Sequence, residues 1–183
     1  MKLAAPLRER LARVRLLALD ADGVLTDGSL VYGPEGEALA VYHVRDGLGL
    51  RLLRENGVHV AVITARGSAP LGRRLAELGI SHYLPGRRDK WRAVEEVLKR
   101  LHLQPEQTAF AGDDVLDLGA MRHVGLAIAV RDAHPLVTAE AHWTTEQPGG
   151  RGAVREIADA ILESRGVLAA ACEALLKSAT EVK

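Results

Sequence analysis

The chain has a single cysteine, Cys172, so it can form no internal disulfide. Its 24 basic residues are balanced by 24 acidic residues, and no net charge favours nucleic acid or an anionic membrane as a partner. No apolar run approaches the ~18 residues that would span a bilayer. The N-terminal segment MKLAAPLRER also lacks the apolar centre of a signal peptide. We therefore expect a cytoplasmic protein with a small-molecule partner.

The length of 183 residues suits a single domain that can bury a real hydrophobic core, and apolar residues make up 48% of the chain. We expect this domain to cover residues 1–183, with its core at about 14–165 and a tail at 166–183. The tail could be a further helix or a frayed end.

Short apolar runs alternate with longer stretches of helical periodicity, a pattern typical of an α/β fold. We predict a doubly wound parallel sheet with helices on both faces. The expected strands are residues 15–19, 58–63, 81–84, 108–111 and 126–130, with 141–144 as a further candidate. The expected helices are residues 48–55, 69–78, 90–101, 115–122 and 153 to about 165.

Residues 29–44 do not follow this alternation of apolar runs and helical stretches, because single apolar and polar residues alternate there around the turn Gly33-Pro34-Glu35-Gly36. Such alternation around a turn predicts a β-hairpin. The hairpin would follow the first strand, at the carboxyl ends of the strands, where open α/β sheets bind their ligands.

Polar residues stand directly after three of the expected strands: Asp20, Thr64 and Asp113. Because the carboxyl ends of parallel strands share one edge of a sheet, these side chains should converge there. Each has a simpler explanation when taken singly: Asp22 could belong to a turn with Gly23, and Asp113 could cap a helix.

The carboxylates of Asp20, Asp22 and Asp113 are harder to explain as a set. Two unit charges ~4 Å apart repel by about 4 kcal/mol at an effective dielectric constant of 20. A divalent cation would remove that repulsion, and ligands that are all oxygen atoms favour Mg²⁺. The seven histidines are scattered along the chain, so no cluster of Cys and His indicates zinc.

Four segments match, in order, the motifs of the haloacid dehalogenase superfamily: DADGVLTD at 20–27, Thr64, Lys90 and GDDVLD at 112–117. Within it, the chain resembles the capless 3-deoxy-D-manno-octulosonate 8-phosphate phosphatase family, which acts in the synthesis of the lipopolysaccharide inner core. This resemblance covers about residues 16–165 and includes HVRDGLGLRLL, DAHP and PGGRGAVREI. It implies a Mg²⁺-dependent phosphatase that forms an aspartyl-phosphate.

The resemblance also implies a role for each motif residue. Asp20 would be the nucleophile and a metal ligand. Asp22 would bind the metal through its backbone carbonyl, contact the substrate and act as general acid and base through its carboxyl group. Thr64 and Lys90 would hold the phosphoryl oxygens, and Asp113 would bind Mg²⁺.

Further positions in the motifs have supporting roles in the family. Asp114 and Asp117 would orient the water molecules around the metal. Asp27 also matches the family, but an Asp before Gly28 is well explained as part of a turn. Ala65 stands where relatives usually carry glycine, which would restrict the loop beside the phosphate.

The family pattern supplies candidate substrate ligands in addition to Asp22 and Lys90: His43, Val44, Arg45, Asp46, Gly47, Arg51, Arg66 and Arg74. Arginine suits a sugar acid because its planar fork can donate two parallel hydrogen bonds to a carboxylate. Arg51 and Arg74 could instead lie on solvated helix faces. Residues 149–152 could be a mobile closing loop or a linker into the last helix.

The spacing of the motifs leaves no room for a cap domain, because Asp20 and Thr64 are 44 positions apart and Thr64 and Lys90 are 26 apart. An open site would expose the intermediate to bulk solvent. Capless relatives of this type form a homotetramer through the hairpin, and neighbouring subunits complete the pockets. The resemblance therefore implies a homotetramer here.

Three alternatives remain. One is a catalytically inactive interaction module, but every motif position that carries the chemistry is occupied. A nine-carbon sialic-acid-like 9-phosphate is the competing substrate, but phosphatases of that kind typically carry Glu where Arg66 stands and Lys where Glu77 stands. A signalling receiver domain also combines an acidic pair, Thr and Lys, yet its acceptor Asp lies on a middle strand. Here the middle strand ends in Thr64, which argues against a receiver.

Overall fold

The computed structural model describes residues 3–181. Its main feature is a six-stranded sheet in the order β5-β4-β1-β6-β7-β8, and every pair of neighbouring strands is parallel. The strands are β1 (Leu16–Leu19), β4 (His59–Ile63), β5 (His82–Leu84), β6 (Thr108–Gly112), β7 (Leu126–Ala129) and β8 (Trp143–Thr144). All six correspond to segments that the sequence predicted as strands.

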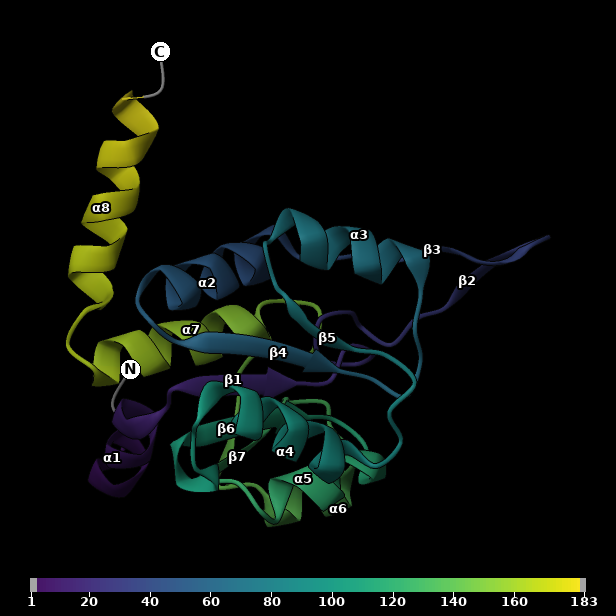
Figure 1. The fold of residues 1–183 in the computed structure, drawn as a ribbon, viewed down its shortest axis with the longest axis horizontal. Coiled ribbons are helices and arrows are strands. Elements are labelled where there is room, and N and C mark those ends of the chain that lie inside the picture. The colour runs from purple at the N-terminus through teal and green to yellow at the C-terminus, as the bar shows by residue number, and fades with distance from the viewer. Residues whose placement is uncertain (1–2, 182–183) are drawn as a thin grey trace.

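Helices cover both faces of the sheet, so the prediction of a doubly wound α/β fold is confirmed (Figure 1). One face carries α1 (Ala5–Arg13), α2 (Val44–Glu55), α3 (Ala69–Glu77) and α7 (Ala153–Ser164); the other carries α4 (Lys90–Leu101), α5 (Leu118–Met121) and α6 (Pro135–Glu140). The short 3-10 helices are η1 (Pro105–Gln107) and η2 (Val115–Asp117).

Side chains of β1 alternate between two apolar cores, as the pleat of a strand requires. Leu17 and Leu19 belong to the core under α2 and α7, whereas Leu16 and Ala18 belong to the core under α4. All four are fully buried. β1 pairs with β4 on one side and with β6 on the other, so the residue that follows Leu19 lies at the centre of the sheet edge.

The segment between β1 and α2 contains β2 (Val31–Gly33) and β3 (Gly36–Leu39), which pair antiparallel across the predicted turn. The paired strands are shorter than the predicted hairpin at residues 29–44. In Figure 1 they extend away from the sheet and its helices. Between β4 and α4 the chain forms α3 and β5.

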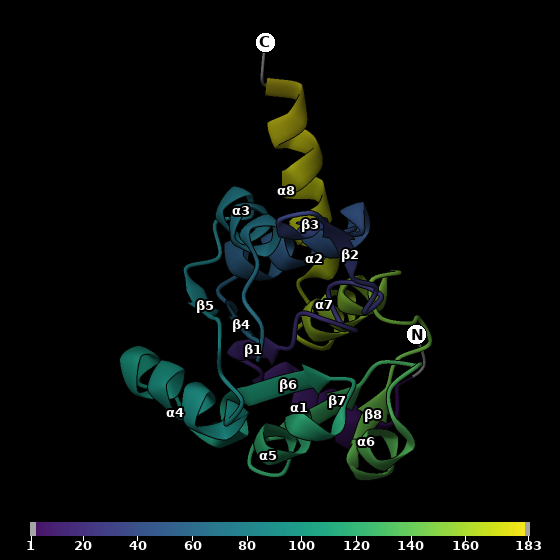
Figure 2. The ribbon, with the colours of Figure 1, turned by 90° about the vertical axis from the view of Figure 1, so that its right-hand side faces the viewer.

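Some helix boundaries differ from the prediction. α2 begins at Val44, four positions before the predicted start at residue 48. The prediction missed this first turn because Gly47 and Gly49 weaken the helical pattern in the sequence. The helix predicted at 115–122 is divided into η2 and α5, since the Asp117 side chain bonds back to the preceding backbone. The tail forms α8 (Leu168–Glu181), which extends from the end of α7 (Figure 2).

None of the helices that the structure describes combines the length and the apolar character that a membrane crossing requires.

Candidate active site

Residues after three neighbouring strands meet at the carboxyl edge of the sheet. Asp20 follows β1, Thr64 follows β4 and Asp113 follows β6, while Lys90 begins α4. Asp20, Thr64 and Lys90 are buried, although the interior of a protein rarely holds such polar groups without partners. The site is therefore set into the molecule at the middle of the sheet edge.

Lys90 lies between two carboxylates. Its Nζ is 2.7 Å from Oδ2 of Asp20 and 2.5 Å from Oδ1 of Asp117, and its side chain is only 2% exposed. Burial favours the neutral amine, but the charges of Asp117 and Asp20 outweigh that effect and raise the pKa of Lys90. Lys90 therefore stays cationic beside the carboxylates of Asp20 and Asp117.

Both oxygens of the fully buried Asp117 are engaged. Oδ1 pairs with Lys90, and Oδ2 accepts hydrogen bonds from the backbone N–H of Asp113 at 2.9 Å and of Asp114 at 3.2 Å. Gly112 has to be glycine here, because a Cβ at that position would overlap with the Asp117 side chain. Asp117 thus holds Lys90 and the Asp113 loop in a fixed relation.

The remaining carboxylate oxygens suit a divalent cation. Ligand atoms of Asp20, Asp113 and Asp117 lie within 4.8 Å of one another. Oδ1 of Asp113 is buried and finds no hydrogen-bond partner among the residues that the structure describes. When all groups are ionised, three carboxylates and the Lys90 ammonium leave two negative charges, which one Mg²⁺ would neutralise. Of these three residues, Asp113 is the one with a buried carboxylate oxygen that has no hydrogen-bond partner among the described residues, so Asp113 is the clearest candidate ligand.

The pKa values of two of these carboxyl groups are raised. Burial, together with the charges of Asp117 and Asp20, raises the pKa of Asp113 to about 7. Burial raises the pKa of Asp20 to about 6, although Lys90 opposes this rise and Asp117 adds to it. A bound cation would favour the ionised form of both groups.

Asp22 and Arg66 lie opposite each other beside this cluster. Nε of Arg66 is 3.3 Å from Oδ2 of Asp22, and both side chains are partly exposed. The Thr64 hydroxyl accepts a hydrogen bond from the backbone N–H of Arg66 at 3.1 Å, which fixes the loop after β4. The Asp22 carboxyl group is therefore within reach of solvent, unlike that of Asp117.

The predicted substrate ligands around α2 occupy different environments. A Cβ at Gly47 would overlap with the guanidinium group of Arg74, so this arginine of α3 lies against the first turn of α2. Arg51 instead pairs with Glu55 at 2.7 Å on the exposed face of α2. Arg45 borders a concavity along α7, and Val44 is exposed.

Asp46 is turned away from solvent and is only 2% exposed. Its carboxylate accepts hydrogen bonds from the backbone N–H of Gly152 at 3.2 Å and of Arg155 at 2.8 Å. The carboxylate thus caps the start of α7, whose own N-cap residue, Gly152, has no side chain. His43 precedes α2, and its buried Nδ1 finds no hydrogen-bond partner among the described residues.

Relatives with established names cover most of the chain. The 3-deoxy-D-manno-octulosonate 8-phosphate phosphatase of Yersinia pestis is 48% identical over 154 residues, which are 84% of this chain and 82% of that protein. The enzyme of the same name from Escherichia coli (strain K12) is 44% identical over 155 residues, 85% of this chain and 82% of that protein. The chain belongs to the 3-deoxy-D-manno-octulosonate 8-phosphate phosphatase family. A model of the haloacid dehalogenase-like hydrolase family also matches residues 82–157.

Solved structures of this phosphatase family have the same fold. The Yersinia pestis enzyme superimposes with a TM-score of 0.89 at 46% identity, covering 91% of this chain and 90% of that chain. The Moraxella catarrhalis enzyme, solved in complex with a magnesium ion, a phosphate ion and a 3-deoxy-D-manno-octulosonate (KDO) molecule, superimposes with a TM-score of 0.91 at 36% identity. That match covers 94% of this chain and 99% of that one.

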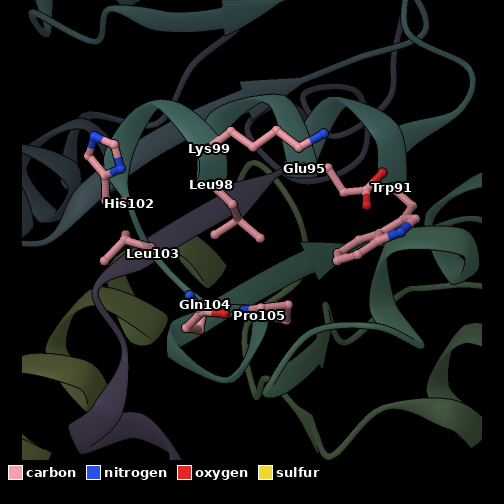
Figure 3. A pocket seen from close by; sticks show the side chains of 8 residues that line it. All are labelled: Trp91, Glu95, Leu98, Lys99, His102, Leu103, Gln104 and Pro105. Carbon is pink, nitrogen blue, oxygen red and sulfur yellow. The ribbon is translucent and has the colours of Figure 1, made fainter.

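A separate concavity lies along α4 and the segment that follows it (Figure 3). It is lined by Trp91, Glu95, Leu98, Lys99, His102, Leu103, Gln104 and Pro105. Gln104 and Pro105 come shortly before β6, whereas Asp113 follows it, so this part of the lining lies at the opposite end of β6 from Asp113. The concavity is therefore distinct from the candidate active site.

The predicted role of Asp117, orientation of water around the metal, did not include its contacts with Lys90 and the backbone. The spacing of Asp114 and Asp117 could have indicated the backbone contacts, because residues three positions apart at the start of a helix can form reciprocal capping bonds. It gives no sign of the contact with Lys90, which is 27 positions away. The pairing of Arg151 with Asp27 at 3.0 Å had no comparable signal, since 124 positions separate the two residues.

Proposed function

We propose that this protein hydrolyses 3-deoxy-D-manno-octulosonate 8-phosphate to the free sugar acid and phosphate, a step in the synthesis of the lipopolysaccharide inner core. The observation that carries the proposal is the cluster of Asp20, Lys90, Asp113 and Asp117 at the sheet edge, in which Asp113 is half-buried and the other three residues are buried. Its support is the family membership and the relative whose structure contains Mg²⁺, phosphate and KDO.

In the proposed reaction, a carboxylate oxygen of Asp20 attacks phosphorus, and the bond between phosphorus and the sugar oxygen breaks. Asp22 donates a proton to the leaving alkoxide. Asp22 then accepts a proton from the water molecule that attacks the aspartyl-phosphate, which releases phosphate and restores the Asp20 carboxylate. Asp22 can serve both steps because it is partly exposed and can exchange its proton.

Thr64 and Lys90 hold the phosphoryl oxygens, and the charge of Lys90 stabilises the negative charge of the transition state. Asp20, Asp113 and the backbone carbonyl of Asp22 would hold Mg²⁺, with Asp114 and Asp117 supporting the ligand loop. When bound, Mg²⁺ neutralises the phosphate oxygens and makes phosphorus more electrophilic.

The sugar acid is recognised by cationic groups at the mouth of the site. Arg66 lies beside Asp22, and Arg74 lies against Gly47 at the start of α2. Both can donate paired hydrogen bonds to the substrate carboxylate. His43, Val44, Arg45 and Arg51 complete the proposed set, in which Asp46 acts by fixing this turn to α7.

A panel of phosphorylated sugars tests the substrate. We expect the highest kcat/KM for the eight-carbon 3-deoxy sugar acid 8-phosphate. Arg66→Glu should lower that value at least tenfold, because it places an anion beside the substrate and Asp22. Arg8→Glu, on the exposed face of α1, is the matched control and should be neutral. A higher kcat/KM of the unmodified enzyme for a nine-carbon 9-phosphate would refute the substrate assignment and leave the phosphatase chemistry in place.

We further propose that the protein is a homotetramer assembled through the β2–β3 hairpin, with neighbours covering the open sites. The support is a group of exposed apolar side chains on and beside these strands, including Leu30 at 42%, Tyr32 at 63% and Val41 at 66% exposure. Solvent-exposed apolar residues gathered on a projecting element are typical of an interaction surface.

Replacing Leu30 and Val41 together by Asp should dissociate the tetramer and lower activity in parallel, because buried charges oppose the contact. Light scattering and turnover would be measured on the same sample. Leu136→Asp is the control, since this residue of α6 is equally exposed at 57% but lies away from the hairpin. A fully active monomer would contradict the proposal.

A further inference from the structure

The segment 148–152, between β8 and α7, is fixed directly onto the loop that follows β1. Gly149 and Gly150 are buried, and a Cβ on Gly150 would overlap with the backbone of Thr26. Four hydrogen bonds hold the segment in place. The backbone N–H of Gly149 donates to Oδ1 of Asp132 at 2.9 Å, and that of Gly150 donates to the Val24 carbonyl at 2.9 Å. The Arg151 side chain donates to Asp27 at 3.0 Å, and the Gly152 N–H donates to the Asp46 carboxylate at 3.2 Å. This geometry supports a fixed wall of the site rather than a mobile closing loop.

Two close backbone approaches connect this wall to the metal site. A Cβ on Gly149 would overlap with the carbonyl group of Gly23. A Cβ on Gly23 would in turn overlap with the carboxylate of Asp113, and Gly23 has a φ of +82°, which also favours glycine. Gly149, Gly23 and the Asp113 carboxylate are therefore stacked in direct contact.

The backbone carbonyl of Asp113 is also held, by a segment that contacts Gly149. The backbone N–H of His134 donates to the Asp113 carbonyl at 2.7 Å, and Asp132, two positions earlier, accepts from Gly149 N. Asp113, residues 132–134, Gly149 and Gly23 thus form a closed ring of contacts. A displacement of any member would be transmitted to the Asp113 side chain.

We infer that Gly149 is a positioning residue for the metal site: its close packing holds Gly23 where the Gly23 backbone limits the position of the Asp113 carboxylate. The inference rests on the proposed function, because it assumes that Asp113 binds Mg²⁺. Mg²⁺ requires near-ideal octahedral geometry with ligand distances of about 2.0–2.1 Å, so a small shift of one ligand lowers affinity. Groups that orient metal ligands typically change metal affinity by about 10–100-fold when mutated.

The test is calorimetric titration of the purified protein with Mg²⁺ in the absence of substrate. Gly149→Ala should weaken Mg²⁺ binding at least tenfold, because the added methyl group displaces Gly23. Asp132→Ala should weaken it less, since it releases Gly149 without adding bulk. Asp132→Asn keeps the accepting oxygen while removing the charge, and it should retain the wild-type affinity. Gly72→Ala, on α3 with ordinary van der Waals space for a Cβ, is the control and should be neutral.

A folded Gly149→Ala variant with wild-type affinity for Mg²⁺ would overturn the inference. If Gly149→Ala does not fold, Asp132→Ala decides: weakened binding that is rescued in Asp132→Asn supports the inference, and unchanged binding overturns it. A wild-type protein that binds no Mg²⁺ would refute the metal site of the proposed function, and this inference with it.

Discussion

Asp20→Asn should reduce phosphate release by about 10⁴-fold or more while the protein remains folded. The amide cannot form the acyl-phosphate on which the proposed reaction depends, and losing the nucleophile of a hydrolase typically removes most of its rate enhancement. Folding should survive because Asn keeps the oxygen that accepts from the Ala21 N–H at 2.7 Å. Lys90 also keeps Asp117 as a partner, so no buried charge is left unpaired.

The measurement is phosphate release under single-turnover conditions, with thermal unfolding followed on the same preparation. Asp159→Asn is a matched control, because it removes a carboxylate that pairs with Arg155 on α7, outside the site. More than a trace of activity in a clean Asp20→Asn preparation would refute covalent catalysis by Asp20. Loss of folding would instead show that this carboxylate has a structural role.

Sequence patterns predict this site well where it depends on local order along the chain. The apolar runs before Asp20 and Asp113 are strands, and β1 and β6 are parallel neighbours. The residues that directly follow these two strands therefore have to lie at the same edge of the sheet. Ligand atoms of Asp20 and Asp113 do lie within 4.8 Å of each other. Strand order alone is sufficient for that result.

Other features depend on contacts between distant segments and have no local signature. Asp46 lies 106 positions before Gly152, whose N–H it binds, so its sequence neighbours indicate only the start of α2. The packing of Gly149 on Gly23 is equally remote in sequence. A run such as Gly149-Gly150 is compatible with both a mobile loop and a tight backbone contact, and only tertiary structure separates the two.

The charge arrangement of the site predicts two functions for Lys90, one in folding and one in the proposed reaction. Its ammonium group separates the carboxylates of Asp20 and Asp117 in a buried environment, where repulsion is poorly screened. Without Lys90, the cluster of Asp20, Asp113 and Asp117 would carry three negative charges when ionised. We therefore expect Lys90 to stabilise the folded state as well as to bind the phosphoryl group in the proposed reaction.

Lys90→Met should lower the free energy of unfolding by about 3–5 kcal/mol in the presence of a chelator, the typical cost of removing one partner from a buried ion pair. Urea unfolding with and without Mg²⁺ measures this change, and Mg²⁺ should offset part of the loss by neutralising the carboxylates. Lys99→Met, on the exposed face of the same helix, should change stability by less than about 0.5 kcal/mol.

The double variant Lys90→Met, Asp117→Asn separates the structural from the catalytic contribution. Removing both charges returns the cluster to the two negative charges of the wild type, so part of the stability should return, although Asp20 still lacks its partner. Turnover should remain at least about 100-fold below that of the wild type, because the Lys90 ammonium no longer stabilises the phosphoryl oxygens. A double variant with wild-type turnover would show that Lys90 acts only on folding. Conversely, a single Lys90→Met variant as stable as the wild type in chelator would contradict the electrostatic account, because the buried carboxylates would then tolerate one another without the lysine.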